Sequence, residues 1–167
     1  MNYMSIITND IANGSGICVS LFVSGCPHKC KGCFNPEAWD YEAGQPFTEE
    51  TMEEICDAIE ANGILRNFSI LGGEPLAPHN RTCVAEIIDT IRERYGNSIK
   101  IYIWTGYIIE DLIKENDIEL NYILSNINVL IDGPYVEELR DMTLYLRGSS
   151  NQRIIDLKEE FDIFLKK

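Results

Sequence analysis

The stretch Cys26-Pro27-His28-Lys29-Cys30-Lys31-Gly32-Cys33 places three cysteines on one short segment, in a C-x3-C-x2-C spacing. Three soft thiolates so close together suit an iron–sulfur cluster or zinc rather than a hard cation. A [4Fe-4S] cube held by three cysteines keeps one iron open, and an open metal position can bind a substrate or a cofactor. The spacing therefore predicts a cluster with a chemical role.

Two other interpretations of this stretch stay open. His28 could complete a structural zinc site with the three cysteines, although such sites more often contain paired C-x2-C knuckles. A disulfide framework needs an oxidising compartment, whereas the sequence has no signal segment and no apolar run of transmembrane length. We therefore expect a cytoplasmic protein with reduced thiols.

Length and composition indicate one globular unit. The 167 residues are enough to bury a proper core, 45% of them are hydrophobic, and no Gly/Ser-rich or Pro-rich linker divides them. We expect a single domain over residues 1–167. The formal charge of −13 argues against nucleic acid as a partner and against an anionic membrane surface.

Apolar runs alternate with helical patterns along the chain. Strands are expected at residues 17–24, 68–71, 99–104 and 128–131, helices at 48–59, 80–95 and 108–115, and a last helix or extended segment at 154–164. This order implies a parallel α/β sheet, and the small number of units predicts a partial rather than a full βα barrel. Cys18, Cys56 and Cys83 lie in apolar patterns and are expected to pack in the core.

Each expected strand ends in an unusual loop. After the cysteine loop come Gly72-Gly73-Glu74-Pro75, Trp104-Thr105-Gly106-Tyr107 and Asp132-Gly133-Pro134. In such folds sites lie at the carboxyl ends of strands, so these positions favour an enzyme. Thr105 is either part of a plain turn or a cofactor contact, and Asp132 either binds a cofactor or partner or caps its own turn.

Taken together, the segments resemble the activating proteins of anaerobic ribonucleoside-triphosphate reductases, which are small radical S-adenosylmethionine enzymes. The resemblance spans nearly the whole chain and is carried by residues 21–28 with Cys30 and Cys33, 44–47, 72–75, 104–107, 129–133 and 147–152. The cysteine and Gly-Gly-Glu motifs identify only the superfamily. The Trp-Thr-Gly-Tyr and Arg-Gly-Ser-Ser-Asn-Gln segments indicate this family.

The resemblance implies a partial barrel of the radical S-adenosylmethionine type and a mechanism. Cys26, Cys30 and Cys33 would hold a [4Fe-4S] cluster, whose open iron binds S-adenosyl-L-methionine. Reductive cleavage of that cofactor would give a 5′-deoxyadenosyl radical. The radical would then remove a hydrogen atom from a glycine near the C-terminus of the reductase large subunit.

The resemblance also implies which residues contact the cofactor. Glu74 and its glycines would receive the α-ammonium group, and Thr105 would face the ribose or methionine part. Relatives often have an aromatic residue before the third cysteine, where this chain has Gly32, so the adenine contact is expected to move to Phe34. The full expected set is Gly32, Cys33, Phe34, Gly72, Gly73, Glu74, Thr105 and Asp132.

Further departures and rival functions remain. Many activases contain a Gly-Pro-Gly-Ile-Arg segment, in which this chain has Ser15 in place of the proline and Cys18 in place of the arginine. The chain therefore has no arginine at this position to take any role that the arginine has in those activases. The rivals are an activase of another glycyl-radical enzyme such as pyruvate formate-lyase, a radical synthase for a small molecule, and a non-catalytic metal-binding or electron-transfer module. Lys29 and Lys31 form a basic spot suited to an acidic electron donor such as reduced flavodoxin.

Overall fold

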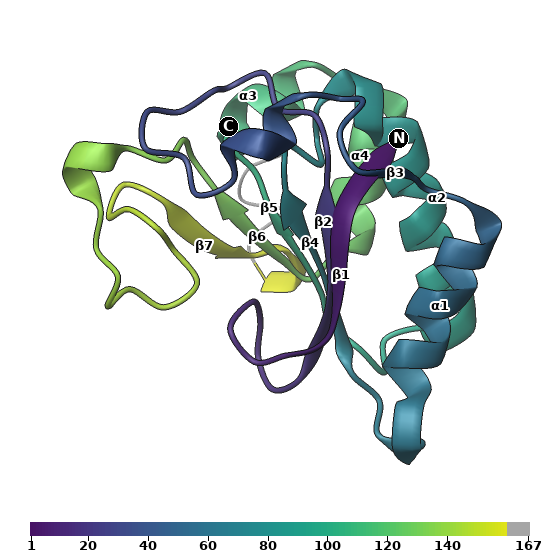
Figure 1. Cartoon of the computed structure of the whole chain (residues 1–167). Helices are drawn as coiled ribbons and strands as arrows, with labels where there is room; N and C mark the ends of the chain where they lie inside the picture. Colours follow the sequence, from purple (N-terminus) through teal and green to yellow (C-terminus); the bar gives the residue numbers. More distant parts are fainter. Residues whose placement is uncertain (160–167) are drawn as a thin grey trace.

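The centre of the computed structural model, which describes residues 1–159, is a sheet in which the four expected strands lie side by side (Figure 1). They are β2 (Cys18–Val23), β4 (Asn67–Gly72), β5 (Ile101–Trp104) and β6 (Val129–Asp132). Each adjacent pair in this order is parallel. The α/β class and the parallel centre of the sheet are therefore confirmed.

Three antiparallel strands extend this centre into a seven-stranded mixed sheet of order β3-β1-β2-β4-β5-β6-β7. The added strands are β1 (Asn2–Asp10), β3 (Gln45–Pro46) and β7 (Arg153–Asp156). The sequence patterns did not predict β1 or β3. Of the last expected segment, 154–164, residues 154–156 are extended within β7, residues 157–159 are helical, and residues 160–164 lie outside the described part of the chain.

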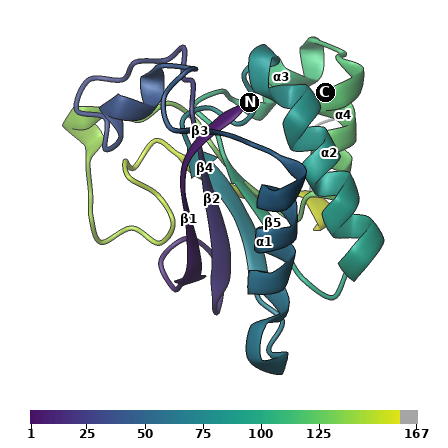
Figure 2. The same cartoon turned by 45° about the vertical axis from the view of Figure 1, so that its right-hand side comes forward.

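Four helices pack on one face of the sheet (Figure 2). They are α1 (Glu49–Glu60), α2 (Pro78–Tyr95), α3 (Ile109–Lys114) and α4 (Ile118–Asn126). Thr48 caps α1 through a capping box with Thr51, and Gly96 ends α2 as expected. None of the helices in residues 1–159 is both long and apolar enough to cross a membrane.

Successive side chains along the strands point to opposite faces of the sheet, and they form two apolar cores of unequal size. Side chains such as Leu21 and Ile70 join the helices in the larger core, which also contains Cys56 and is contacted by the partly buried Cys83. Cys18 is fully buried as well, so the expected packing role of these three cysteines is confirmed.

The opposite face of the sheet carries a smaller apolar cluster of Tyr102, Val129 and Ile131, against which Trp104 and Leu146 pack. The segments 26–44 and 133–152 lie on this side (Figure 2). The helix-free face is therefore covered by irregular chain, which includes the cysteine loop.

Candidate functional site

The four strand-end loops meet at one edge of the sheet because β2, β4, β5 and β6 all point the same way. Each loop is hydrogen-bonded to the next. The N–H of Glu74 donates to the Gly25 carbonyl (2.7 Å), that of Gly106 to the Glu74 carboxylate (2.8 Å), and that of Gly133 to the Tyr107 carbonyl (2.8 Å). The expected loops thus form one continuous surface.

The cysteine loop, residues 26–33, leaves the end of β2 with its thiols partly exposed. Cys26, Cys30 and Cys33 are all free and of intermediate exposure. Within residues 1–159, no group of three or more His, Cys, Asp or Glu side chains is already arranged around a metal position. The loop supplies the right donors on one short segment, and their sulfurs must draw together to bind a metal.

Two of these thiols sit in surroundings that favour the protonated form. Burial raises the pKa of Cys26, and the backbone N–H of His28 only partly opposes this effect. Burial likewise raises the pKa of Cys30, against the backbone N–H of Tyr135. Both thiols are therefore protonated in the free protein at neutral pH, and metal binding must release their protons.

The carboxylate of Glu74 lies at the centre of the edge. It is 1% exposed, so its negative charge needs internal hydrogen-bond donors. Its Oε1 accepts from Leu76 N (2.9 Å) and Thr105 Oγ1 (2.8 Å), and its Oε2 accepts from Gly106 N (2.8 Å) and His28 Nε2 (2.8 Å). An ionised carboxylate offers about four lone-pair positions, so these four donors fill it.

His28 connects the cysteine loop to this carboxylate. Besides its hydrogen bond to Glu74, its ring meets the Tyr107 ring edge-on, with centroids 4.5 Å apart. The ring also lies over Gly106, where a Cβ would come within 2.6 Å of the His28 Cδ2 atom. Burial and the charge of Glu74 raise the pKa of Tyr107. Residue 106 must therefore be small if His28 is to reach Glu74.

Gly73 and Asn80 hold the Glu74 loop against the end of β2. A Cβ on Gly73 would lie 2.6 Å from the Gly25 carbonyl oxygen, so only glycine allows this approach. The fully buried Asn80 side chain donates to the carbonyls of Ser24 (3.0 Å) and Glu74 (2.9 Å). Asn80 had no recognisable motif in the sequence, because its role depends on a contact across 56 residues.

The carboxylate of Asp132 faces Arg153 and the start of α3. Arg153 Nε donates to Asp132 Oδ1 (2.9 Å), and Ile109 N donates to Oδ2 (2.9 Å). Arg153 also makes a two-pronged contact with Glu110, and hydrogen bonds to Glu110 and Asp132 raise the pKa of its guanidinium. The fully buried Asp132 thus joins β6, β7 and α3, which neither alternative from the sequence anticipated.

Phe34 lies beside the cysteine loop and is 52% exposed. Its ring contacts that of Tyr135 edge-on at 5.3 Å, and the Arg140 guanidinium lies 5.2 Å from its centroid. The Glu137 carboxylate occupies the space where Gly32 would carry a Cβ. The segment after β6 therefore packs directly against the cysteine loop.

The Gln152 side chain closes the irregular segment 133–152 into an Ω-loop. Its Oε1 accepts from Gly148 N (2.8 Å) and Ser149 N (3.2 Å), and its Nε2 donates to the Gly133 carbonyl (3.1 Å). Ser149 Oγ accepts from Val136 N within the same segment. The Arg-Gly-Ser-Ser-Asn-Gln segment thus shapes the loop that touches Phe34.

Comparison of the sequence with known proteins identifies the family of the chain. Residues 12–155 match a protein-family model described as a 4Fe-4S single cluster domain. The chain is 38% identical to the anaerobic ribonucleoside-triphosphate reductase-activating protein of Escherichia coli K12 over 95% of this chain and 100% of that protein. The chain belongs to the family of anaerobic ribonucleoside-triphosphate reductase-activating proteins.

Other activating proteins of this family match over similar lengths. The protein of Haemophilus influenzae is 36% identical over 92% of this chain and 97% of its own length. That of phage T4 is 38% identical over 92% of this chain and 93% of its own. The family resemblance drawn from the sequence is therefore confirmed.

Membership of this activating-protein family also decides between the two metals. The matched family model describes an iron–sulfur domain, so the zinc alternative with His28 as fourth ligand is set aside. In the structure His28 Nε2 is hydrogen-bonded to Glu74. The structure brings the cysteines, Glu74, Thr105 and Phe34 to one edge, while it commits Asp132 to Arg153.

Proposed function

We propose that this chain is the activase of an anaerobic ribonucleoside-triphosphate reductase. In this proposal Cys26, Cys30 and Cys33 hold a [4Fe-4S] cluster that binds S-adenosyl-L-methionine. When bound, the cluster and cofactor would supply one-electron cleavage of the sulfonium bond, which would serve to remove a hydrogen atom from a glycine of the reductase. The observation that carries the proposal is the full-length match to activating proteins, together with three partly exposed thiols beside Glu74.

The residues present fit an iron–sulfur group. Three soft thiol donors are available on one loop, and none of them is used in a disulfide. The loop lies at the carboxyl-terminal edge of the parallel strands, where α/β enzymes bind their ligands. The three thiols are partly exposed on that edge, so a group bound there could be reached by a ligand.

The chain's own residues would bind and orient the cofactor. Glu74 supplies a fixed negative charge for the α-ammonium group, and the main chain at Gly72 and Gly73 allows close approach. Thr105 holds the Glu74 carboxylate and lies next to the expected ribose position. Phe34, with Gly32 and Cys33 before it, offers an exposed aromatic face for adenine.

We leave Asp132 out of the proposed cofactor site. Both of its carboxylate oxygens are bonded to Arg153 or to the first turn of α3, and the side chain is fully buried. A cofactor contact would require breaking a charge-assisted pair, which is costly away from water.

The proposed partners are the large subunit of the reductase, with a glycine near its C-terminus, and a reduced electron donor such as flavodoxin. The names of the relatives support the reductase as partner. For the donor, Lys29 and Lys31 are both exposed beside the cysteines, and Lys31 Nζ lies 2.9 Å from Glu138 Oε1, which partly neutralises its charge.

We also infer that the four parallel strands represent a partial barrel of the radical S-adenosylmethionine type within one domain. Support comes from the parallel order β2-β4-β5-β6 and from the helices on one face only. The opposite face, which carries the fully buried hydroxyl side chains of Ser20 and Ser69, would be the concave side.

The test is anaerobic iron and sulfide analysis of reconstituted protein, with electron paramagnetic resonance of the reduced state before and after addition of S-adenosyl-L-methionine. We expect about four irons per chain and a spectrum that the cofactor alters. Zinc in place of iron, or a spectrum indifferent to the cofactor, would exclude the proposed function and favour a non-catalytic metal-binding module.

A further inference from the structure

Glu74 has no free hydrogen-bonding position for an incoming ligand. Its two oxygens accept four hydrogen bonds of 2.8–2.9 Å, and the side chain is 1% exposed. If Glu74 receives the α-ammonium group, as the proposed function holds, one of the present donors must leave. The question is which donor can move.

Three of the four donors are fixed by the fold. Two are backbone N–H groups, of Leu76 and Gly106, and their departure would mean rebuilding two strand-end loops. The third, the Thr105 hydroxyl, is 4% exposed and also accepts a hydrogen bond from Tyr107 N (3.2 Å). The two backbone groups cannot turn away without moving their loops, and Thr105 cannot turn away without losing its second hydrogen bond.

His28 is more exposed than the Thr105 hydroxyl and, unlike the two backbone donors, it can move without its loop. Its side chain is 19% exposed, and it is held in place by a single hydrogen bond and one aromatic contact. Rotation about its side-chain bonds releases Glu74 Oε2 without moving a strand. An imidazole N–H and an ammonium N–H also present the same kind of donor to a carboxylate.

We infer that His28 is a displaceable occupant of the ammonium position on Glu74. It keeps the buried carboxylate paired in the cofactor-free protein, and it swings out when the α-ammonium group of S-adenosyl-L-methionine takes its place. His28 lies between Cys26 and Cys30, so the exchange also links cofactor binding to the path of the cysteine loop. This inference rests on the proposed function and adds a residue that competes with the cofactor.

The test compares His28→Ala with wild type, both reconstituted with iron and sulfide and kept anaerobic. Cofactor affinity is read from titration of the electron paramagnetic resonance spectrum, and melting temperature is read with and without saturating cofactor. We expect affinity to rise about tenfold, the factor expected from removing a competing hydrogen bond to a charged group. The variant should melt below wild type when free and level with it when saturated.

The chain offers a matched control in its other histidine. His79 also meets an aromatic ring edge-on, that of Tyr41 at 4.7 Å, but it is exposed and makes no hydrogen bond to Glu74. His79→Ala should leave cofactor affinity at the wild-type value. Should His28→Ala lose iron, His28→Phe replaces it, because the phenyl ring keeps the contact with Tyr107 and cannot donate a hydrogen bond.

The outcomes separate this inference from the proposed function. A purely structural role of His28 lowers both melting temperatures equally and leaves affinity unchanged, and a direct role in cofactor binding lowers affinity; either result overturns the inference alone. A wild-type spectrum that ignores the cofactor overturns the proposed function, and the role of His28 falls with it.

Discussion

Glu74 illustrates what sequence patterns predict for single residues and what they leave out. The resemblance carried by the Gly-Gly-Glu motif predicts that this carboxylate faces a ligand. Its donors His28 and Thr105 lie 46 and 31 residues away, and these pairings depend on strand register and loop path. Spacing and the family resemblance therefore singled out the cysteines and Glu74 as candidates, but spacing offered His28 only as a zinc ligand.

At the same scale, the cysteines divide into two classes that mutation should separate. Cys30→Ala should abolish iron incorporation, because the thiolate is one of three proposed cluster ligands. Cys56→Ala and Cys83→Ala should retain the wild-type iron content, since both residues pack in or against the helix-side core. The measurement is iron per folded chain after anaerobic reconstitution.

Folding must be checked in these variants, since Cys56 is fully buried. Its loss should lower the free energy of unfolding by about 1–2 kcal/mol through the small cavity that it leaves. Iron is therefore normalised to protein that retains the far-ultraviolet circular dichroism of wild type. Loss of iron from a folded Cys56→Ala variant would refute its assignment to the core.

Among the elements, the buried parallel strands were predictable, whereas β1 and β3 were not. The strands β2, β4, β5 and β6 are apolar runs because helices or covering loops bury them, and such runs stand out in a sequence. In β1 most side chains are partly or fully exposed, and its apolar residues are mixed with polar ones, so the stretch shows no continuous apolar run. The two-residue β3 is too short to leave any pattern.

The Ω-loop formed by residues 133–152 should depend on Gln152. Replacement by leucine removes three hydrogen bonds to the backbone of Gly133, Gly148 and Ser149. We expect Gln152→Leu to lower the free energy of unfolding by about 1–3 kcal/mol, because these groups lose partners in a partly buried position. Amide hydrogen exchange should accelerate within 133–152 and remain slow in α2.

The other glutamine of the chain gives the control. Gln45 lies exposed in β3, so Gln45→Leu should leave exchange in residues 133–152 unchanged. Equal acceleration of amide hydrogen exchange in α2 and in the Ω-loop of Gln152→Leu would indicate global destabilisation. It would contradict a local role of Gln152 in holding the loop.

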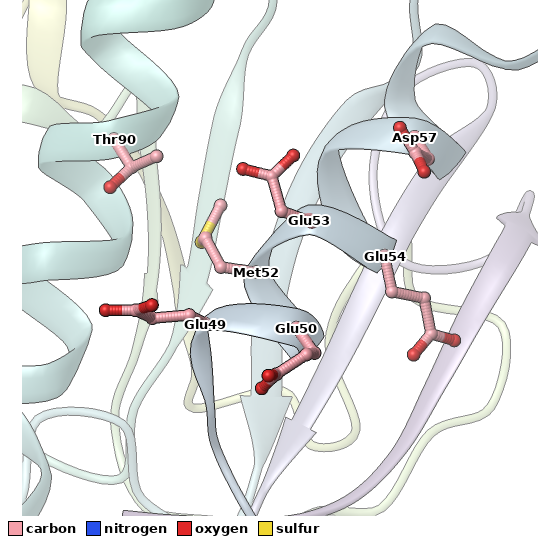
Figure 3. Close-up of a pocket in the computed structure, with 7 residues that line it drawn as sticks. All are labelled: Glu49, Glu50, Met52, Glu53, Glu54, Asp57 and Thr90. Carbon is pink, nitrogen blue, oxygen red and sulfur yellow. The ribbon is translucent and has the colours of Figure 1, made fainter.

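For the whole molecule, one dense group of acidic side chains lies on α1. Five carboxylates of α1 line a pocket that faces Thr90 of α2 (Figure 3). They are Glu49, Glu50, Glu53, Glu54 and Asp57. Only Glu53 among them is paired, with Arg94 at 3.3 Å, within the described residues. Part of the net charge of −13 is therefore gathered on one helix, where neighbouring carboxylates repel one another.

Relief of this repulsion should stabilise the protein. Glu54 lies four residues after Glu50 and three before Asp57, and like charges at these spacings destabilise a helix. Glu54→Gln should raise the melting temperature by about 1–3 °C at low ionic strength, and salt should shrink the gain. Glu49→Gln is the control, because Glu49 lies in the first turn and interacts favourably with the helix dipole. A gain that persists in high salt would argue against an electrostatic cause.

The uneven exposure of the cysteines has a consequence for handling the protein in air. Cys18 and Cys56 are inaccessible, whereas Cys26, Cys30 and Cys33 combine partial exposure with close spacing on one loop. Oxidants can therefore join these three sulfurs in disulfides, which would block the metal ligands while leaving the rest of the fold intact; Cys83 is also partly exposed, but it lies outside this loop. Protein purified under oxygen would then look well folded and still fail to take up iron until a reductant restores the thiols.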